Sequence, residues 1–294
     1  SVQKGNNVSV NGEAPLSLTL DGKDPQSCQF LSKRAPDESH EFTWKEVTTT
    51  RGGELAELLG VQLRSVDSLV VKGNVNDKDF HAMWDASLYG YLSVINLKNA
   101  VLENNAVPDT AFFHENEQYE GSSHEIFYYI GLRKIILPEG LEKIGEGAFY
   151  QASALRQVNF PSTLRYIGDF AFNATKLEMN QLVIPEGVEE INQYAFAFCR
   201  KLKAQVTLPS TIKKIGEWAF YGCPITSINL PEGLESLGSL AFWDCDLREV
   251  SIPSSCHEFN EGWQFGFNRN LEKMHLPEGM TEIPDHFAVD CFRL

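Results

Sequence analysis

The stretch LPEGLEKIGEGAF, at 137–149, decides the fold because the chain writes it again and again. Close copies are FPSTLRYIGDFAF at 160–172, LPSTIKKIGEWAF at 208–220 and LPEGLESLGSLAF at 230–242. An apolar residue followed by proline recurs at intervals of roughly 22–24 residues, a period typical of solenoids, at Leu137, Phe160, Ile184, Leu208, Leu230, Ile252 and Leu276. The sequence therefore predicts a stack of similar coils.

Each position of the repeated phrase has a structural reason. Before the proline, inward apolar residues alternate with outward ones, as in Ile135-Ile136-Leu137, which predicts a short strand. The proline ends that strand because it donates no hydrogen bond to a ladder. A second extended piece follows, and its Leu141 and Ile144 should point inward. The phenylalanines of the Ala-Phe pairs should then form a stacked column, Phe149, Phe172, Phe196, Phe220 and Phe242.

A single coil is too small to repay the conformational entropy of its own ordering, so neighbouring coils must share a core. The predicted fold class is a repeat solenoid, mostly β with short helical or 3-10 turns, preceded by an α+β capping region. We expect an N-terminal extension or linker at 1–43, divergent capping repeats with an inserted loop at 44–131, and seven repeats at 132–294. Within the capping region, the patterns predict a helix near 52–60, a strand at 69–72, a helix from about Asp77 and a divergent repeat at 92–113.

Composition excludes several functions. The chain has 294 residues and a net charge of −15, which argues against binding to nucleic acid or to anionic lipid. No apolar run approaches the roughly 20 residues of a membrane-spanning helix. The chain begins at Ser1 without a signal-like segment, so it is either cytosolic or exported with its signal already removed.

The six cysteines include no CxxC pair, so no zinc ribbon or thioredoxin-like site is indicated. Eight residues past each Ile-Gly position the chain places small side chains, namely Ala152, Thr175, Cys199, Cys223, Cys245 and Cys291. Free cysteine packs as a small apolar residue. We expect reduced packing cysteines in this column, with a disulfide between adjacent repeats as the alternative.

Two surfaces are candidate binding sites. The first is the outward row of the first strands, Lys134, Ile136, Gln157, Asn159, Gln181, Val183, Gln205, Thr207, Asn229, Glu249 and His275. The second is an edge of aromatic residues beside the Ala-Phe pairs, Tyr150, Phe170, Tyr194, Trp218, Tyr221 and Trp243. Solenoids often use such a strand face to bind ligands. Tyrosine and tryptophan rings offer an apolar contact area together with a polar O–H or N–H group. The alternatives are a solvated sheet face and rings that pack over the neighbouring turn.

A third cluster lies in the segment at 114–129, with His114, Glu115, Glu117, Glu120, His124 and Glu125. Oxygen and imidazole ligands suit a divalent cation, yet the spacing matches neither HExxH nor an EF-hand loop. A solvated acidic loop is the simpler interpretation. No catalytic or phosphate-binding motif stands out, and we expect no metal, no cofactor and no enzymatic activity.

The phrase LPEGLEKIGEGAF and its copies resemble the BspA-type leucine-rich repeats of bacterial surface proteins. The resemblance covers roughly 47–294 and includes the leader-like stretch LVVKGNVNDKDFHAMWDA at 69–86. Departures are Cys256 at an inward leucine position, Asn260 at the glycine, Trp263 near the alanine slot, and an inverted Ala-Phe order in DHFAVDC at 285–291. The family carries no catalytic motif, so no catalytic residue is transferred.

The resemblance implies a secreted or surface-attached bacterial protein, often a lipoprotein, that binds host matrix proteins, other cells or glycans. The leading hypothesis is therefore an extracellular or cell-surface adhesion module, monomeric, whose partner is a host extracellular-matrix protein, a mucin or glycan, or another cell-surface protein. The alternative is a structural spacer or assembly protein without a ligand of its own. A metal-dependent hydrolase on the acidic loop is the remote alternative.

Overall fold

The computed structural model describes residues 40–113 and 130–294. The chain divides into two compact units, and the described residues all belong to the one formed by Lys33–Glu115 and Tyr129–Leu294. The other unit, Ser1–Ser32 with Asn116–Tyr128, lies outside the described residues. Most of the predicted N-terminal extension and the predicted acidic loop therefore stay predictions.

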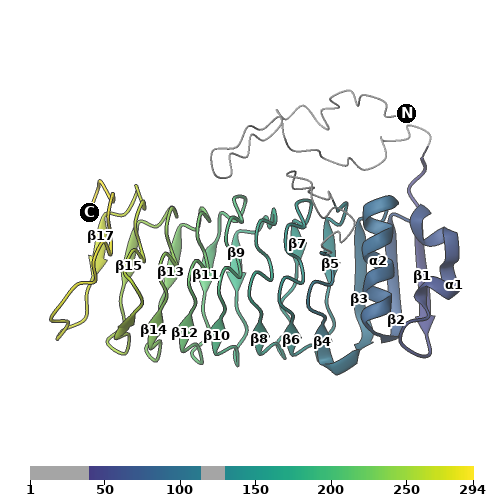
Figure 1. The fold of residues 1–294 in the computed structure, drawn as a ribbon, viewed down its shortest axis with the longest axis horizontal. Coiled ribbons are helices and arrows are strands. Elements are labelled where there is room, and N and C mark those ends of the chain that lie inside the picture. Colours follow the sequence, from purple (N-terminus) through teal and green to yellow (C-terminus); the bar gives the residue numbers. More distant parts are fainter. Residues whose placement is uncertain (1–39, 114–129) are drawn as a thin grey trace, which may run out of the picture. The chain divides into compact units, whose positions relative to one another are not determined.

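The N-terminal part of the described unit is an α+β region. Three strands pair in parallel, β1 (Trp44–Thr49), β2 (Ser68–Val75) and β3 (Val94–Leu102). Between them lie α1 (Leu55–Leu59), a 3-10 helix (Gly60–Ser65) and α2 (Asp77–Tyr89), and a second 3-10 helix (Glu103–Asn105) follows β3 (Figure 1). Asn76 begins α2 because its side chain accepts the Lys78 N–H while Asp79 accepts the Asn76 N–H, a reciprocal cap.

Each following coil contributes two short strands. The first strands are β5 (Lys134–Ile136), β7 (Gln157–Val158), β9 (Gln181–Val183), β11 (Gln205–Thr207), β13 (Ser227–Asn229), β15 (Glu249–Ser251) and β17 (Lys273–His275). The second strands are β4 (Ala106–Val107), β6 (Lys143–Ile144), β8 (Tyr166–Ile167), β10 (Glu190–Ile191), β12 (Lys214–Ile215), β14 (Ser236–Leu237) and β16 (Glu258–Phe259).

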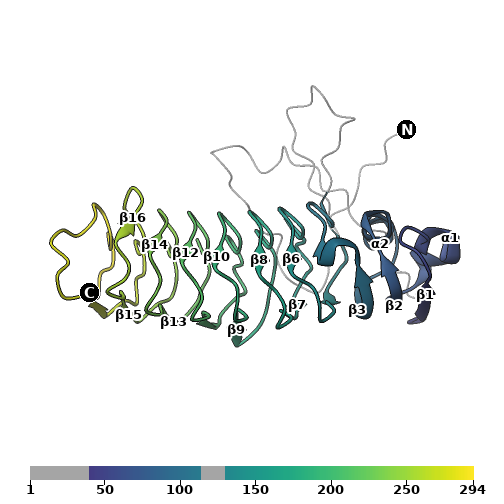
Figure 2. The ribbon, with the colours of Figure 1, turned by 90° about the horizontal axis from the view of Figure 1, so that it is seen from below.

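The two sets of strands line different sides of the stack (Figures 1 and 2). The second strands form one continuous parallel sheet from β4 to β16. The first strands form three parallel sections, β1-β2-β3-β5-β7, β9-β11-β13 and β15-β17. The predicted repeat solenoid is confirmed.

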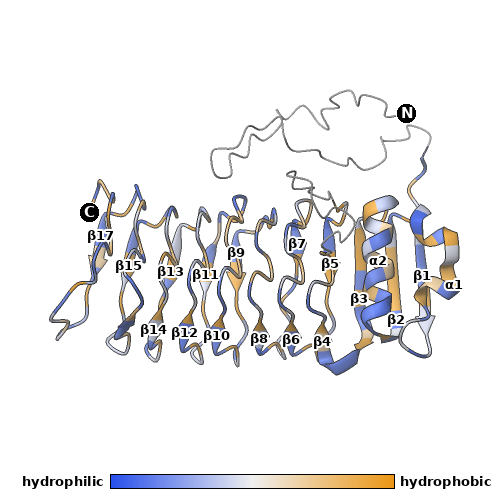
Figure 3. Cartoon of the chain, in the orientation of Figure 1, coloured by the Kyte–Doolittle hydropathy of each residue, from blue (hydrophilic) through white to orange (hydrophobic). Residues whose placement is uncertain are grey.

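A column of phenylalanines forms the centre of the core. Neighbouring rings stack nearly parallel with centroids 5.2 to 5.4 Å apart, from Phe112 through Phe149, Phe172, Phe196, Phe220 and Phe242 to Phe265. At both ends an edge-on ring closes the column, Phe80 at one and Phe287 at the other. Apolar and polar stretches alternate along each coil, as Figure 3 shows. The column is longer than the five rings that the sequence predicts.

The coil that contains Trp263 departs from the repeated phrase. It has an extra residue at 261–262, and Trp263 directly precedes the alanine slot, as the sequence indicates. Gln264 takes the alanine slot, fully buried, and its carbonyl accepts the Phe242 N–H at 2.8 Å. The inverted order in the last coil is real, since the carbonyl of Phe287 accepts the Phe265 N–H at 2.9 Å.

The turns after the prolines alternate between Pro-Glu-Gly and Pro-Ser-Thr, with Pro-Ser-Ser at 253–255, and the two kinds interlock across coils. The Glu186 carboxylate accepts the Ser210 N–H and hydroxyl, both at 3.1 Å. Thr211 Oγ1 accepts the Gly187 N–H and donates to the Val188 carbonyl, both at 2.9 Å. The same clasp joins the turns at 139–141 to 162–163 and 232–234 to 254–255. The stack is therefore locked in pairs of coils.

The small-residue column is a ladder of buried hydrogen bonds. Each thiol donates to the carbonyl of a phenylalanine in the preceding coil, Cys199 to Phe172 at 3.1 Å, Cys223 to Phe196 at 2.9 Å, Cys245 to Phe220 at 3.3 Å and Cys291 to Phe265 at 3.2 Å. Asn268 fills the slot for which the sequence offers no small residue, and donates to Phe242 at 2.7 Å. The five cysteines of the described residues are free thiols, as expected, and Cys28 lies outside these residues.

Burial raises the pKa of the thiols of Cys223 and Cys245 well above the ordinary value, and raises the pKa of Cys256 to about 12. The folded state therefore holds these thiol protons where the unfolded chain releases them. The stability contributed in this way is complete below about pH 9 and is lost as the pH rises further.

We predict that Thr211→Val lowers the free energy of unfolding by about 1–3 kcal/mol, because the partly buried Gly187 N–H and Val188 carbonyl lose their partner while the shape is kept. Thr207→Val, the same change on the exposed side of β11, should stay within about 0.5 kcal/mol of the parent. Urea denaturation measures both. Equal losses in the two variants would show that the clasp adds nothing.

We also predict that Cys223→Ser/Cys245→Ser flattens the alkaline loss of stability. Thr175 shows that the column accepts a hydroxyl donor, since its Oγ1 donates to the Phe172 carbonyl at 2.9 Å. Urea denaturation at pH 8 and pH 10.5 should show a smaller decrease for the double variant than for the parent. An identical decrease would mean that these thiols ionise equally in both states.

Candidate binding surfaces

The predicted strand-face residues lie on the first strands, except Asn159, which directly follows β7. We call their outward side chains from β5 to β17 the strand face. Nine of the eleven candidates are exposed, whereas Lys134 and Ile136 are half-buried. The exposed ones are Gln157, Asn159, Gln181, Val183, Gln205, Thr207, Asn229, Glu249 and His275. The structure thus brings the candidates into one row, although the row is interrupted between β7 and β9 and between β13 and β15.

The middle of the strand face is free of charge. The strand register places Gln205 between Gln181 and Ser227, and Thr207 between Val183 and Asn229. From β7 to β13 every outward side chain of these strands is an amide, a hydroxyl or a valine. Charges lie at the two ends of the strand face, with Lys134 on β5 at one end, and His275 Nε2 lying 2.9 Å from the Glu249 carboxylate at the other. A strip of this kind stands out in a chain with a net charge of −15.

The second strands carry the opposite kind of surface. Their side chains form ion pairs between coils, Lys143 with Asp109 at 3.3 Å, Lys214 with Glu190 at 2.8 Å and Lys213 with Glu235 at 3.2 Å. The hydrogen bond that the Lys214 ammonium donates to the Glu190 carboxylate raises the pKa of Lys214, against the opposing effect of desolvation. In each pair the two opposite charges neutralise each other, and both side chains are exposed to solvent. This side of the stack is therefore a solvated face whose charges are already paired.

Insertions in two coils create a depression at the start of β9 and β11. The segment from the leucine to the proline has two extra residues at 177–185 and one at 202–209, compared with 155–161. Met179 packs against the core, and the Gln205 N–H donates to the Asn180 carbonyl at 3.0 Å. The resulting open depression has a volume of about 690 Å³ and is lined by Asn180, Gln181, Lys203, Gln205 and Thr226. Sequence reasoning missed it, although the uneven spacing was the signal.

The predicted aromatic edge also exists, but its rings cover one another. Phe170 stacks on Tyr194 at 4.7 Å and Tyr194 on Trp218 at 5.3 Å, with interplanar angles of 8° and 16°. Tyr150 meets Phe170 edge-on at 6.0 Å, and Tyr221 packs on Trp218 at 4.4 Å. All five are half-buried. Burial raises the pKa of the hydroxyls of Tyr194 and Tyr221.

Other rings extend this edge. Trp243, the sixth candidate, packs on Phe267 at 4.7 Å and on Trp263 at 5.5 Å, and Trp263 stacks on His286 at 3.9 Å. Phe113 and Phe198 join through Tyr150 and Tyr221. Leu240 occupies the equivalent position between the two groups. Because most ring faces are already used, the edge is better suited to holding coils together than to stacking on a ligand.

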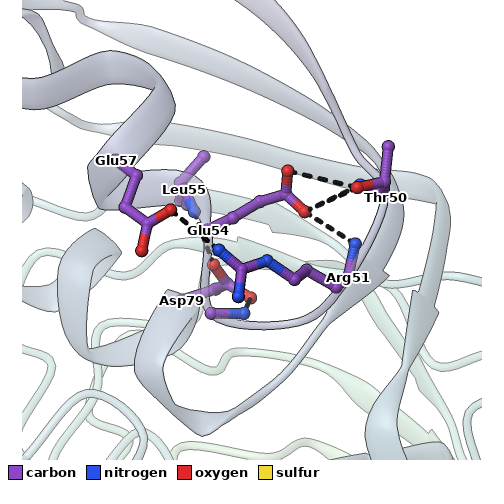
Figure 4. A network of polar contacts seen from close by, with 7 residues as sticks. Thr50, Arg51, Glu54, Leu55, Glu57 and Asp79 are labelled. Atoms are coloured by element: carbon purple, nitrogen blue, oxygen red, sulfur yellow. Dashed lines mark hydrogen bonds and ion pairs between the residues drawn. The ribbon is translucent and has the colours of Figure 1, made fainter.

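A buried carboxylate network in the N-terminal region serves the fold (Figure 4). Asp79 accepts the N–H groups of Gly53 at 2.6 Å and Leu55 at 2.9 Å. Glu54 accepts the Arg51 N–H at 2.6 Å, a bond that lowers the pKa of its carboxyl against the effect of burial. These groups complete the hydrogen bonds of the turn before α1.

Within 40–113 and 130–294, no group of three or more His, Cys, Asp or Glu could hold a metal ion. The predicted acidic cluster from His114 to Glu125 lies outside these residues. In the same parts of the chain, no helix is long and apolar enough to span a bilayer.

Comparison with known structures gives distant likenesses. A leucine-rich repeat protein from Bacteroides ovatus has a TM-score of 0.49 and 16% identity, over 81% of this chain and 67% of its own. The pneumococcal vaccine antigen PcpA has a TM-score of 0.40 and 17% identity, over 77% and 66%. A leucine-rich cell surface protein from Faecalibacterium prausnitzii has a TM-score of 0.30 and 15% identity, over 92% and 97%. These likenesses are too distant to indicate a ligand.

The match to a sequence family is direct. The chain covers less than two thirds of the pneumococcal antigen, at 66% of its length. Comparison with curated proteins gives no match. The BspA type leucine rich repeat region, however, matches in six copies over residues 121–206 and 203–294, which is more than half of the chain. The chain belongs to the BspA-type leucine-rich repeat family.

Proposed function

We propose that the protein is an extracellular or cell-surface binding module that presents its strand face to a host or microbial macromolecule. Its partner would be a matrix protein, a mucin or glycan, or another surface protein, and the protein would act as a monomer attached to the cell after export. The family and the cell-surface descriptions of some similar structures support this proposal. The repeat stack supplies a rigid support for such a surface.

The observation that carries the proposal is the uncharged middle of the strand face. Ion pairs between coils lie on and next to the second strands, whereas β7 to β13 present only amides, hydroxyls and Val183. Binding to such a strip avoids the cost of desolvating charges. A structural spacer, the alternative, has no need to keep one long face free of charge. This contrast favours binding over a purely structural role.

We predict that a charge placed on the strand face weakens binding. Thr207→Arg puts a cation in the middle of the strip, and a bound macromolecule would have to desolvate it, so affinity should fall at least tenfold, or about 1.4 kcal/mol. Glu189→Arg places the same side chain at an exposed position on the other side of the stack. That control should change affinity less than twofold.

The measurement is surface plasmon resonance of the whole chain against a panel of matrix proteins, mucins and glycans. The parent should bind at least one of them saturably. Equal effects of the two arginine variants would remove the strand face as the binding surface, and an empty panel would remove the adhesive function.

A further inference from the structure

The depression at the start of β9 and β11, beside the strand face, differs chemically from the uncharged strip. Its lining side chains end in three carboxamides (Asn180, Gln181 and Gln205), one hydroxyl (Thr226) and one ammonium (Lys203). Thr226 is half-buried and the other four are exposed. Its volume of about 690 Å³ lies within the ~300–1,000 Å³ of small-molecule sites. The depression is therefore large enough for one or two sugar rings.

Lys203 supplies an uncompensated positive charge. Arg156 and Glu178 hold the same position in the two preceding coils and pair with each other at 3.0 Å. Among the described residues Lys203 makes no ion pair, and no carboxylate lines the depression. An ammonium left unpaired in a chain with 40 acidic residues and 25 basic ones favours an anionic group on the ligand.

The carboxamides complete the recognition chemistry. Each offers both a donor and an acceptor, which matches the donor and acceptor character of sugar hydroxyl groups. The lining contains no aromatic or aliphatic side chain that would anchor an apolar residue of a protein partner. Binding energy at protein interfaces is concentrated in such anchors. An acidic peptide would therefore find only its charge recognised here.

We infer that this depression binds a carboxylate-bearing saccharide, with Lys203 facing the carboxylate and the carboxamides of Asn180, Gln181 and Gln205 facing the hydroxyls. The inference rests on the proposed function and narrows it, because it names a ligand class for one part of the strand face. The two inserted segments make the site specific to these coils.

The test uses the whole chain, labelled with ¹⁵N, and two probes, sialyllactose and a glucuronic-acid disaccharide. Lactose and the methyl ester of the disaccharide are the neutral controls, and a hexaglutamate peptide is the peptide control. Side-chain amide signals of the asparagines and glutamines report on binding, with Asn180, Gln181 and Gln205 assigned by substitution to alanine. At least one acidic saccharide should shift these three signals saturably, and the neutral sugars should bind at least tenfold more weakly.

Lys203→Gln should weaken acidic-saccharide binding at least tenfold. Lys201→Gln removes the same charge from an exposed lysine that does not line the depression, and should change affinity less than twofold. Equal effects of the two variants would overturn the inference, and so would equal binding of neutral sugars or tighter binding of hexaglutamate. If no acidic saccharide binds while Thr207→Arg still abolishes binding to a macromolecule, the inference fails and the proposed function stands.

Discussion

Stacking of one coil on the next is the interaction on which the whole structure depends. The core has no closed shape of its own, and the phenylalanine column from Phe112 to Phe265 is buried only because each ring covers its neighbour. Backbone bonds follow the same direction, such as that from the Phe196 N–H to the Ala219 carbonyl at 2.8 Å. Positions that face the next coil are therefore constrained, while outward positions are free to vary and to acquire a function.

This constraint explains what could be predicted from the sequence. The inward leucines and isoleucines, the phenylalanine column and both strands per coil follow from a strict phrase whose spacing repeats. Predictions were incomplete where the spacing changed. One extra residue at 261–262 brings Gln264 into the alanine slot, where its side-chain oxygen, Oε1, has no hydrogen-bond partner. Asn268 could not be recognised as an equivalent of cysteine because its hydrogen bond, rather than its size, fits the column.

The candidate sites were only partly predictable. The outward positions of a strand follow from the alternation of inward and outward residues, so the sequence indicates which residues belong to the strand face. Its lack of charge gained meaning only when the structure placed ion pairs such as Lys214–Glu190 on the second strands. The depression depends on how Met179 and Asn180 are accommodated, which no repeat pattern specifies. The aromatic edge was predicted as a row, but the mutual covering of its rings depends on backbone geometry, including positive φ angles at Phe170, Tyr194 and Trp218.

In our proposal, function in this stack resides where coils differ, on a support that repeats. The most direct test of that account is hydrogen–deuterium exchange of the whole chain, with and without the macromolecule of the panel that binds most tightly. The account predicts slower exchange in the segments 178–183 and 203–207, with the second strands β8, β10 and β12 unchanged. Protection of β8, β10 and β12 or of the aromatic edge, with the first strands unchanged, would contradict it.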